Sequence, residues 1–186
     1  MSREERIACF EDTLARCGQE ELAGLTEKAA AESRIYPENY RSKRLYKVWE
    51  PEISVIESTS FAAARENRSK GKIAVLNYAN PHYPGGGVAW GAKSQEEALC
   101  RNSNLYPCIS SDGVYDGFYE YHRTRTDYDF SDRLIYTPGV TVFKDDAPVP
   151  KMLPREEWFQ VDVISCAAPY TAKRRYVNRT AHHGIG

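Results

Sequence analysis

The residues best suited to chemistry are three consecutive glycines, Gly85, Gly86 and Gly87, and the acidic segment 95–97 that follows them after seven residues. Because glycine has no Cβ, such a turn can adopt positive φ angles and let a ligand approach the backbone closely. Successive amides of the turn can form a concave set of donors, which suits a diphosphate. A helix starting at the acidic segment would direct its N-terminal dipole at the same pocket. The spacing therefore predicts a phosphate-binding turn that faces carboxylates.

The acidic segment Gln95-Glu96-Glu97, preceded by Ser94, has two explanations. It matches a capping box, in which Ser94 caps the helix and Glu97 accepts a hydrogen bond from the Ser94 amide. On these four residues alone, capping is the favoured explanation. The other explanation is a carboxylic acid that transfers a proton in catalysis. The two differ in where the Glu97 carboxylate points.

The elements that would position this segment alternate between strands and helices. Residues 73–78 and 161–168 are largely apolar runs of the kind buried on both faces of a sheet. This order predicts an α/β domain with a mixed or parallel central sheet, whose ligands bind beyond the carboxyl ends of the strands. The site is therefore expected on the loops after Asn77 and Ala168. The other predicted elements are helices at 2–31 (with a break at Gly18), 62–67 and 95–106, and short strands at 53–56, 134–136 and 140–143.

Residues 107–131 are polar and rich in Tyr, Asp and Arg, and we expect a long loop or a peripheral hairpin there. Tyr115, Tyr119 and Tyr121 lie in this segment. We interpret them as surface packing and assign them no role in the site.

Composition limits the function classes. The chain has 186 residues, 41% hydrophobic and 27% charged, with a net charge of −1, so no bulk electrostatic signal favours nucleic-acid or membrane binding. Five cysteines without a CxxC pair and four histidines without metal-ligand spacing predict neither a disulfide framework nor a metal or other cofactor. The charged first residues lack the apolar stretch of a secretory signal, and no apolar run is long enough to cross a bilayer. A cytoplasmic protein is expected.

The glycine turn, its spacer and the QEE segment, placed behind the sequence LNYAN at 76–80, together resemble the signature loop of poly(ADP-ribose) glycohydrolases. The likeness continues at CFEDT (9–13), ALCR (98–101), 128–142 and VDVISCAAP (161–169), and it matches the compact bacterial type. The resemblance implies a macrodomain-like fold with a mixed central sheet flanked by helices. It also implies an N-terminal helical extension with its connecting segment at 1–50 and a catalytic domain at 51–186.

The resemblance also assigns roles to residues. It implies that Glu97 is the catalytic acid and that Glu96 hydrogen-bonds ribose hydroxyls beside the bond to be cleaved. The remaining implied roles concern binding: Gln95 orients the loop, Asn77 and Asn80 contact the distal ribose, Gly85, Gly86 and Gly87 hold the diphosphate, and Ala168 and Pro169 line the pocket floor.

The implied reaction is hydrolysis of a ribose–ribose glycosidic bond, with ADP-ribose released from chain ends. Its transition state resembles an oxocarbenium ion, so an acid must protonate the leaving oxygen. Two adjacent carboxylates in an enclosed site raise one pKa, which suits Glu97 as that acid and later as base for water. Since neighbouring helical residues point in different directions, we expect Glu96 to be a poor second catalyst. The bound diphosphate would help to position the water.

The resemblance has a limit at the C-terminal end. Relatives continue past the strand at 161–168 to a WGCG-like loop and a final helix, and an Asn often stands where this chain has Tyr170. We therefore expect that part of the fold is missing, through truncation or because the protein is naturally short. Expected ligands are ADP-ribose, poly(ADP-ribose) and ADP-ribosylated proteins. Two alternatives to the enzyme stay open: a non-catalytic ADP-ribose reader and an inactive truncated relative.

Overall fold

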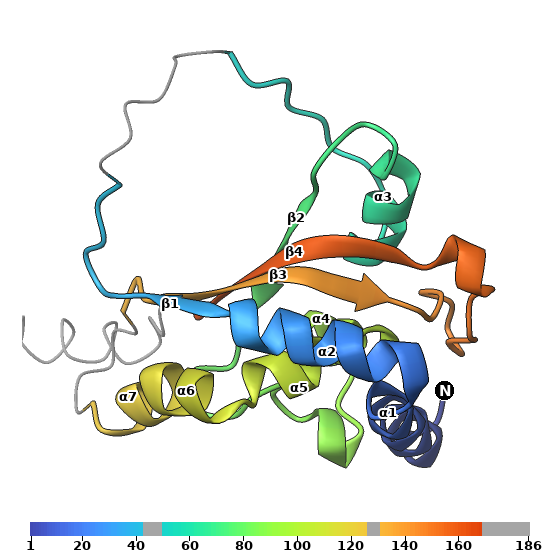
Figure 1. Ribbon diagram of the computed structural model, residues 1–186, viewed down its shortest axis with the longest axis horizontal. Helices are drawn as coiled ribbons and strands as arrows, with labels where there is room; N and C mark the ends of the chain where they lie inside the picture. The colour runs from blue at the N-terminus through green and yellow to red at the C-terminus, as the bar shows by residue number, and fades with distance from the viewer. Residues whose placement is uncertain (43–49, 126–130, 169–186) are drawn as a thin grey trace, which may run out of the picture.

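The computed structural model describes residues 1–42, 50–125 and 131–168. Within them lies one four-stranded sheet with the strand order β1-β3-β4-β2 (Figure 1). β2 pairs with β4 in parallel, while β3 is antiparallel to both β4 and β1, so the sheet is mixed as predicted. The strands are β1 (Arg34–Tyr36), β2 (Ala74–Tyr78), β3 (Leu134–Val142) and β4 (Phe159–Cys166).

The helices flank this sheet unevenly. The first two and those between β2 and β3 gather on one side, and α3 lies on the other side near β2 (Figure 1). The predicted break at Gly18 separates α1 from α2. The helices are α1 (Arg3–Cys17), α2 (Glu20–Glu32), α3 (Ser60–Asn67), α4 (Gln95–Asn102), α5 (Leu105–Ile109), α6 (Asp112–Val114) and α7 (Tyr121–Arg123), with shorter or irregular turns η1 (Val88–Trp90), η2 (Tyr115–Glu120) and η3 (Arg155–Glu157).

One main hydrophobic core joins the sheet to the helices. Phe10 from α1 packs in the same cluster as Leu99 of α4, Phe118 of η2 and Val163 of β4. Full burial of such side chains stabilises the fold by about 1.5–3 kcal/mol each. The first helix is thereby fixed against the helix that carries the acidic pair.

The predicted burial of residues 73–78 on both faces is wrong. β2 is an edge strand in which Val75 and Asn77 are buried, whereas Leu76 is 47% and Tyr78 64% exposed. Within the described residues, the strand predicted at 53–56 is absent as well. Val55 is 97% exposed there, and the segment pairs with no strand of the described residues.

Two further boundaries differ from the predictions. The strands expected at 134–136 and 140–143 form the single strand β3, whose register shifts between Thr137 and Val140. The segment 107–131, expected to be a loop or hairpin, carries the end of α5 and the short helical turns from Asp112 to Arg123, and Tyr119 is fully buried instead of lying at the surface.

No helix in the described ranges is long and apolar enough to span a membrane.

Candidate active site

The glycine turn lies beyond the carboxyl end of β2, where the sheet topology places ligand sites. Gly85 and Gly86 have φ angles of 65° and 58°, in the left-handed region. A Cβ on Gly86 would lie 2.6 Å from Oε1 of Glu97 and 3.0 Å from Oε2 of Glu96. Any side chain at this position would displace both carboxylates, so glycine is required by close approach as well as by φ.

The Glu97 carboxylate faces this turn. Its Oε1 accepts a hydrogen bond from the Gly87 amide at 2.9 Å, and the residue is 6% exposed. Oε2 is buried and has no hydrogen-bond partner among the described residues. Ser94 occupies the N-cap of α4 but its side chain makes no capping bond. The capping-box explanation is therefore wrong for this helix.

Glu96 is anchored on the other side of the turn. It is 3% exposed; its Oε2 accepts from the Asn80 amide at 2.8 Å and its Oε1 from Nδ2 of Asn77 at 3.4 Å. Burial raises the pKa of Glu96 to about 7, and the charge of Glu97 adds to the rise, while the bonds from Asn80 and Asn77 oppose it.

Two expectations about the pair therefore change. We expected neighbouring glutamates to diverge, but both carboxylates lie against Gly86, because the first turn of α4 packs beside the glycine turn. We also expected one raised pKa in the pair and placed it on the acid Glu97; in the structure, burial and the neighbouring charge of Glu97 raise the pKa of Glu96 to about 7.

Asn77 connects the acidic pair to the sheet. Its side chain is fully buried and donates from Nδ2 to the Ser165 hydroxyl at 3.0 Å as well as to Glu96. Asn77 and Ser165 are register partners on the parallel strands β2 and β4. Sequence reasoning missed Ser165, although a serine within the apolar run 161–168 was the available signal.

Asn80 shapes the loop itself. Its Oδ1 accepts from the amides of His82 at 2.8 Å and Tyr83 at 3.0 Å, a local turn that Asn favours. Its predicted contact with ribose stays a prediction.

Gln95 ties α4 to the free edge of β2. Its Oε1 accepts from the Tyr78 amide at 3.1 Å, and its Nε2 donates to the Leu76 carbonyl at 2.7 Å. The side-chain amide thus pairs with the edge strand as a neighbouring strand would. A second donation, to the Ser60 hydroxyl at 3.2 Å, links α3 to the same place.

The glycine amides are engaged within the chain. Gly86 donates to the Tyr83 carbonyl at 3.0 Å, Gly87 donates to Glu97, and the Gly85 amide acts on Glu96 and lowers its pKa. In this arrangement the turn positions the carboxylates, and it does not present these amides as free donors. Diphosphate binding by the three glycines stays a prediction.

The predicted pocket floor is described only in part. Ala168 is exposed and follows the carboxyl end of β4, next to the site where the Ala79 amide donates to the Cys166 carbonyl at 3.1 Å. Pro169 lies outside the described residues. In the described ranges, no group of three or more His, Cys, Asp and Glu side chains is placed to hold a metal ion.

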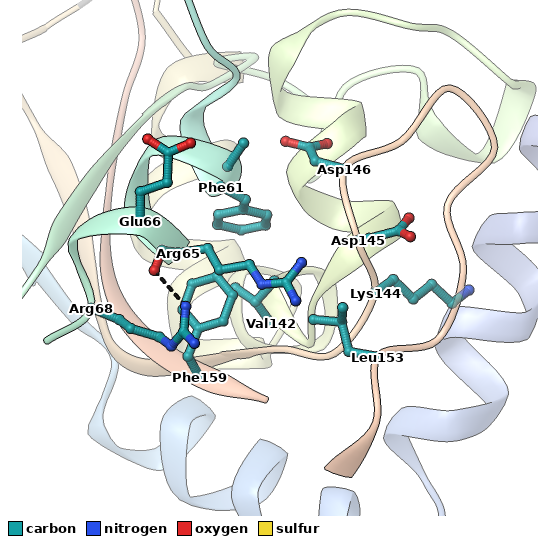
Figure 2. A pocket seen from close by; sticks show the side chains of 11 residues that line it. Phe61, Arg65, Glu66, Arg68, Val142, Lys144, Asp145, Asp146, Leu153 and Phe159 are labelled. Carbon is teal, nitrogen blue, oxygen red and sulfur yellow. Dashed lines mark hydrogen bonds between the residues drawn. The ribbon is translucent and has the colours of Figure 1, made fainter. Parts of the chain in front are cut away.

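A pocket of about 360 Å³ lies at the other end of the sheet, between α3, the end of β3 and the start of β4 (Figure 2). Val142 there pairs with Phe159, whereas β2 reaches its carboxyl end opposite Cys166. On the wall of this pocket formed by the end of α3, Arg68 donates to the Arg65 carbonyl at 2.7 Å (Figure 2). None of the predicted site residues lines it, so we place the candidate site at the glycine turn.

Comparison with solved structures identifies similar proteins. The chain resembles poly(ADP-ribose) glycohydrolase (PARG) from Thermomonospora curvata, with 31% identity and a TM-score of 0.75 over 94% of this chain and 66% of that chain. The same enzyme bound to the inhibitor ADP-HPD matches at 29% identity and a TM-score of 0.73, over 97% and 76%. PARG from Deinococcus radiodurans in complex with ADP-ribose matches at 30% identity and a TM-score of 0.71, over 86% and 64%. The chain thus spans less than two thirds of the first of these structures and of the Deinococcus enzyme.

The search of curated proteins found no match. The family described as microbial-type PARG, catalytic domain, matches residues 5–145, which include the glycine turn, the acidic pair and most of the helical layer. Together with the mixed sheet and the carboxylates gathered at Gly86, this match shows that the chain belongs to the microbial-type PARG catalytic-domain family.

Proposed function

We propose that this protein hydrolyses the ribose–ribose bonds of poly(ADP-ribose) and releases ADP-ribose from chain ends, with Glu97 as the proton donor. One observation carries the proposal: the Glu97 carboxylate is held at the glycine turn by one oxygen while its second oxygen has no partner among the described residues. A general acid needs this combination of fixed position and a free atom directed at substrate. The Thermomonospora and Deinococcus enzymes, crystallised with the inhibitor ADP-HPD and with ADP-ribose, respectively, support the ligand class.

In the proposed reaction, Glu97 protonates the leaving ribose oxygen as the glycosidic bond breaks and positive charge develops at the anomeric carbon. Its carboxylate then accepts a proton from the attacking water. The Gly87 amide keeps one oxygen in place during both transfers, so that little reorganisation is needed.

Glu96 has a separate task in this proposal. Asn80 and Asn77 fix its carboxyl group, and its pKa of about 7 leaves it partly protonated near neutral pH, able to donate to or accept from a ribose hydroxyl. Ser165 acts through Asn77 and is a positioning residue.

The test is release of ADP-ribose from poly(ADP-ribose) by the 186-residue protein and by Glu97→Gln, with calorimetry of ADP-ribose binding to both. We expect the wild type to release ADP-ribose. We expect Glu97→Gln to lose about two or more orders of magnitude in kcat and to keep its affinity for ADP-ribose. Near-normal turnover by Glu97→Gln would remove Glu97 from this role. If the wild type binds ADP-ribose but cleaves no polymer, it is a reader. If it neither binds ADP-ribose nor cleaves polymer, it is an inactive relative.

The division into a helical extension at 1–50 and a catalytic part at 51–186 is also proposed. The proposed extension contacts the catalytic part, because Arg3 donates to the Trp90 carbonyl at 2.9 Å and Arg6 to the Gly91 carbonyl at 2.5 Å. The extension would thus support the segment that follows the glycines. Residues 43–49 and 169–186 lie outside the described ranges.

A cytoplasmic location and ADP-ribosylated proteins as targets complete the proposal. All five cysteines are free, which is expected of a protein in a reducing compartment. ADP-ribosylated proteins carry the same ligand class that the related crystal structures hold.

A further inference from the structure

Two large aromatic side chains stand exposed on the segment that contains the catalytic glycines. Trp90 is 60% and Tyr83 is 51% exposed. Their ring centroids are 6.5 Å apart and the planes meet at 89°, so the two rings form a corner. Leaving such surfaces in water is costly, and neither ring belongs to the hydrophobic core. Packing therefore does not account for them.

Arg123 extends this corner. Its guanidinium carbon lies 5.0 Å from the centroid of the Tyr83 ring and 5.1 Å from that of Tyr115, so the cation sits against both rings. It also donates to the Tyr115 hydroxyl. We call Trp90, Tyr83, Arg123 and Tyr115 the aromatic rim. Alternating rings and positive charge are the combination that binds nucleotide bases and phosphates without sequence readout.

The aromatic rim is joined directly to the catalytic turn. The Tyr83 carbonyl accepts from the Gly86 amide at 3.0 Å, and the Trp90 amide donates to the Gly87 carbonyl at 3.0 Å. Gly86 lies against both carboxylates and Gly87 bonds to Glu97. The two residues that carry the exposed rings are therefore bonded through their backbones to the glycine pair that holds the proton donor.

The segment that carries Trp90 is firmly fixed. Three successive carbonyls, those of Trp90, Gly91 and Ala92, accept bonds from Arg3, Arg6 and Arg101, respectively. A ring on a pre-organised segment loses little conformational freedom on binding, which increases affinity. The corner is thus built as a rigid surface.

The chemistry of the proposed substrate indicates what this surface would meet. In poly(ADP-ribose) the leaving oxygen is the 2′-hydroxyl of the next unit's adenosine ribose, and the adenine is attached at the neighbouring C1′. An acid placed at the leaving oxygen must therefore have that adenine close by. The unit that is released as ADP-ribose lies on the other side of the bond.

We propose that the aromatic rim binds the leaving side of the polymer, with Tyr83 and Trp90 stacking on the adenine of the next unit and Arg123 facing its diphosphate. This inference rests on the proposed function. It assigns a subsite for the unit that stays on the chain, separate from the site that holds the released ADP-ribose.

The test uses di-ADP-ribose, which has one scissile bond and one leaving adenosine, as substrate for Tyr83→Leu and Trp90→Leu. A stacked base contributes about 1–3 kcal/mol, so we expect KM to rise about 5- to 150-fold in each variant. We expect kcat to change little and the Kd of free ADP-ribose, measured by calorimetry, to stay unchanged. Tyr83→Phe keeps the ring and should keep the wild-type KM.

The matched control is Tyr40→Leu. Tyr40 is also 51% exposed but lies next to β1, at the far edge of the sheet from β2, and should not affect KM. If the wild type is active and KM is unchanged in both Leu variants, the proposal that the aromatic rim binds the leaving unit is wrong, while the proposed function stands. A parallel loss of ADP-ribose affinity would also overturn that proposal, because the rings would then bind the released unit. A wild type that cleaves no polymer would overturn both this inference and the proposed function. Trp90→Leu provides a second test if loss of the Tyr83 ring destabilises the protein.

Discussion

Helices α1 and α4 begin with nearly the same residues, Ser-Arg-Glu-Glu at 2–5 and Ser-Gln-Glu-Glu at 94–97, and use them differently. At α1 the Ser2 hydroxyl accepts from the Glu5 amide at 3.1 Å, and the Ser2 amide donates to the Glu5 carboxylate at 2.5 Å, a complete capping box. At α4 neither Ser94 nor Glu97 makes the corresponding bond. The third helical residue caps its own helix in one case and faces the glycine turn in the other.

The surroundings explain the difference. The start of α1 is open to water, so the orphan amide of its own first turn is the best donor available to Glu5. At α4 the Gly87 amide offers a donor at 2.9 Å from a turn that no side chain blocks. The pKa values follow the same division. Hydrogen bonds from the backbone amide of Glu4 and from the Ser2 side chain lower the pKa of Glu4, whereas burial raises the pKa of Glu96 to about 7. The four-residue pattern predicts helix starts well and their chemistry poorly.

The largest expected effect is a loss of kcat when the third residue of α4 is changed from Glu to Gln, compared with the same change at the third residue of α1. Glu97→Gln should lower kcat for polymer about 10²- to 10⁴-fold, since an amide cannot transfer the proton. Glu5→Gln should keep the wild-type kcat and weaken only the cap. Steady-state release of ADP-ribose from polymer measures both. Equal losses in the two variants would mean that helix stability, and not proton transfer, underlies the effect.

The second prediction concerns pH and the second helical residue. The pKa of Glu96 is about 7 in the folded protein against 4.5 when unperturbed. Between these values the unfolded chain releases the proton and the folded protein retains it. The contribution of Glu96 to the free energy of unfolding should therefore fall by about 3 kcal/mol as pH rises from 4.5 to 7.

Glu96→Gln should remove this fall, as measured by urea unfolding at both pH values. Glu4→Gln is the matched control, because the pKa of Glu4 is lowered and its contribution has the opposite sign, being lost as pH falls. An unchanged pH slope in Glu96→Gln would show that the carboxyl group titrates equally in both states.

The third prediction tests the glycine turn that makes the two helices differ. Gly86→Ala introduces a Cβ 2.6 Å from Oε1 of Glu97 at a φ of 58°. We expect a loss of about 1–2 kcal/mol in stability from backbone strain and about 10²-fold in kcat from displaced carboxylates. Gly24→Ala in α2 is the control, since nothing lies within 4 Å of its Cβ. That exchange should stabilise the protein by about 0.5–1 kcal/mol and leave kcat unchanged. Thermal unfolding and polymer assays separate the two outcomes.

The sequence was sufficient for the α/β class, the first two helices and the proximity of the glycine turn to the acidic pair, because each depends on local periodicity or on a glycine turn next to acidic residues. It was insufficient where the structure of a segment depends on the elements that pack against it. The apolar run 73–78 looks alike in a central strand and in the edge strand β2. Residues 138–139, Pro-Gly, read as a break, yet β3 passes through them as a bulge with Gly139 at a φ of 67°.

The site was predictable to a similar depth. Glycines and glutamates could be found from their spacing, but not the direction of the Glu97 carboxylate or which glutamate has the raised pKa, since both depend on burial and on donors far away in the sequence. Ser165 and the aromatic rim depend on packing between segments and were missed for that reason.

The smallest expected effect is a difference in stability between alanine substitutions of the two N-cap serines, Ser2 and Ser94. Ser2→Ala removes a hydroxyl that accepts the Glu5 amide, and loss of such a cap costs about 1 kcal/mol. Ser94→Ala removes a hydroxyl that makes no capping bond, so its cost should be no more than a few tenths of a kcal/mol. Urea unfolding of the two variants measures the difference. If Ser94→Ala proved as costly as Ser2→Ala, the α4 cap would form in solution, and Glu97 would then have to leave the Gly87 amide to complete it.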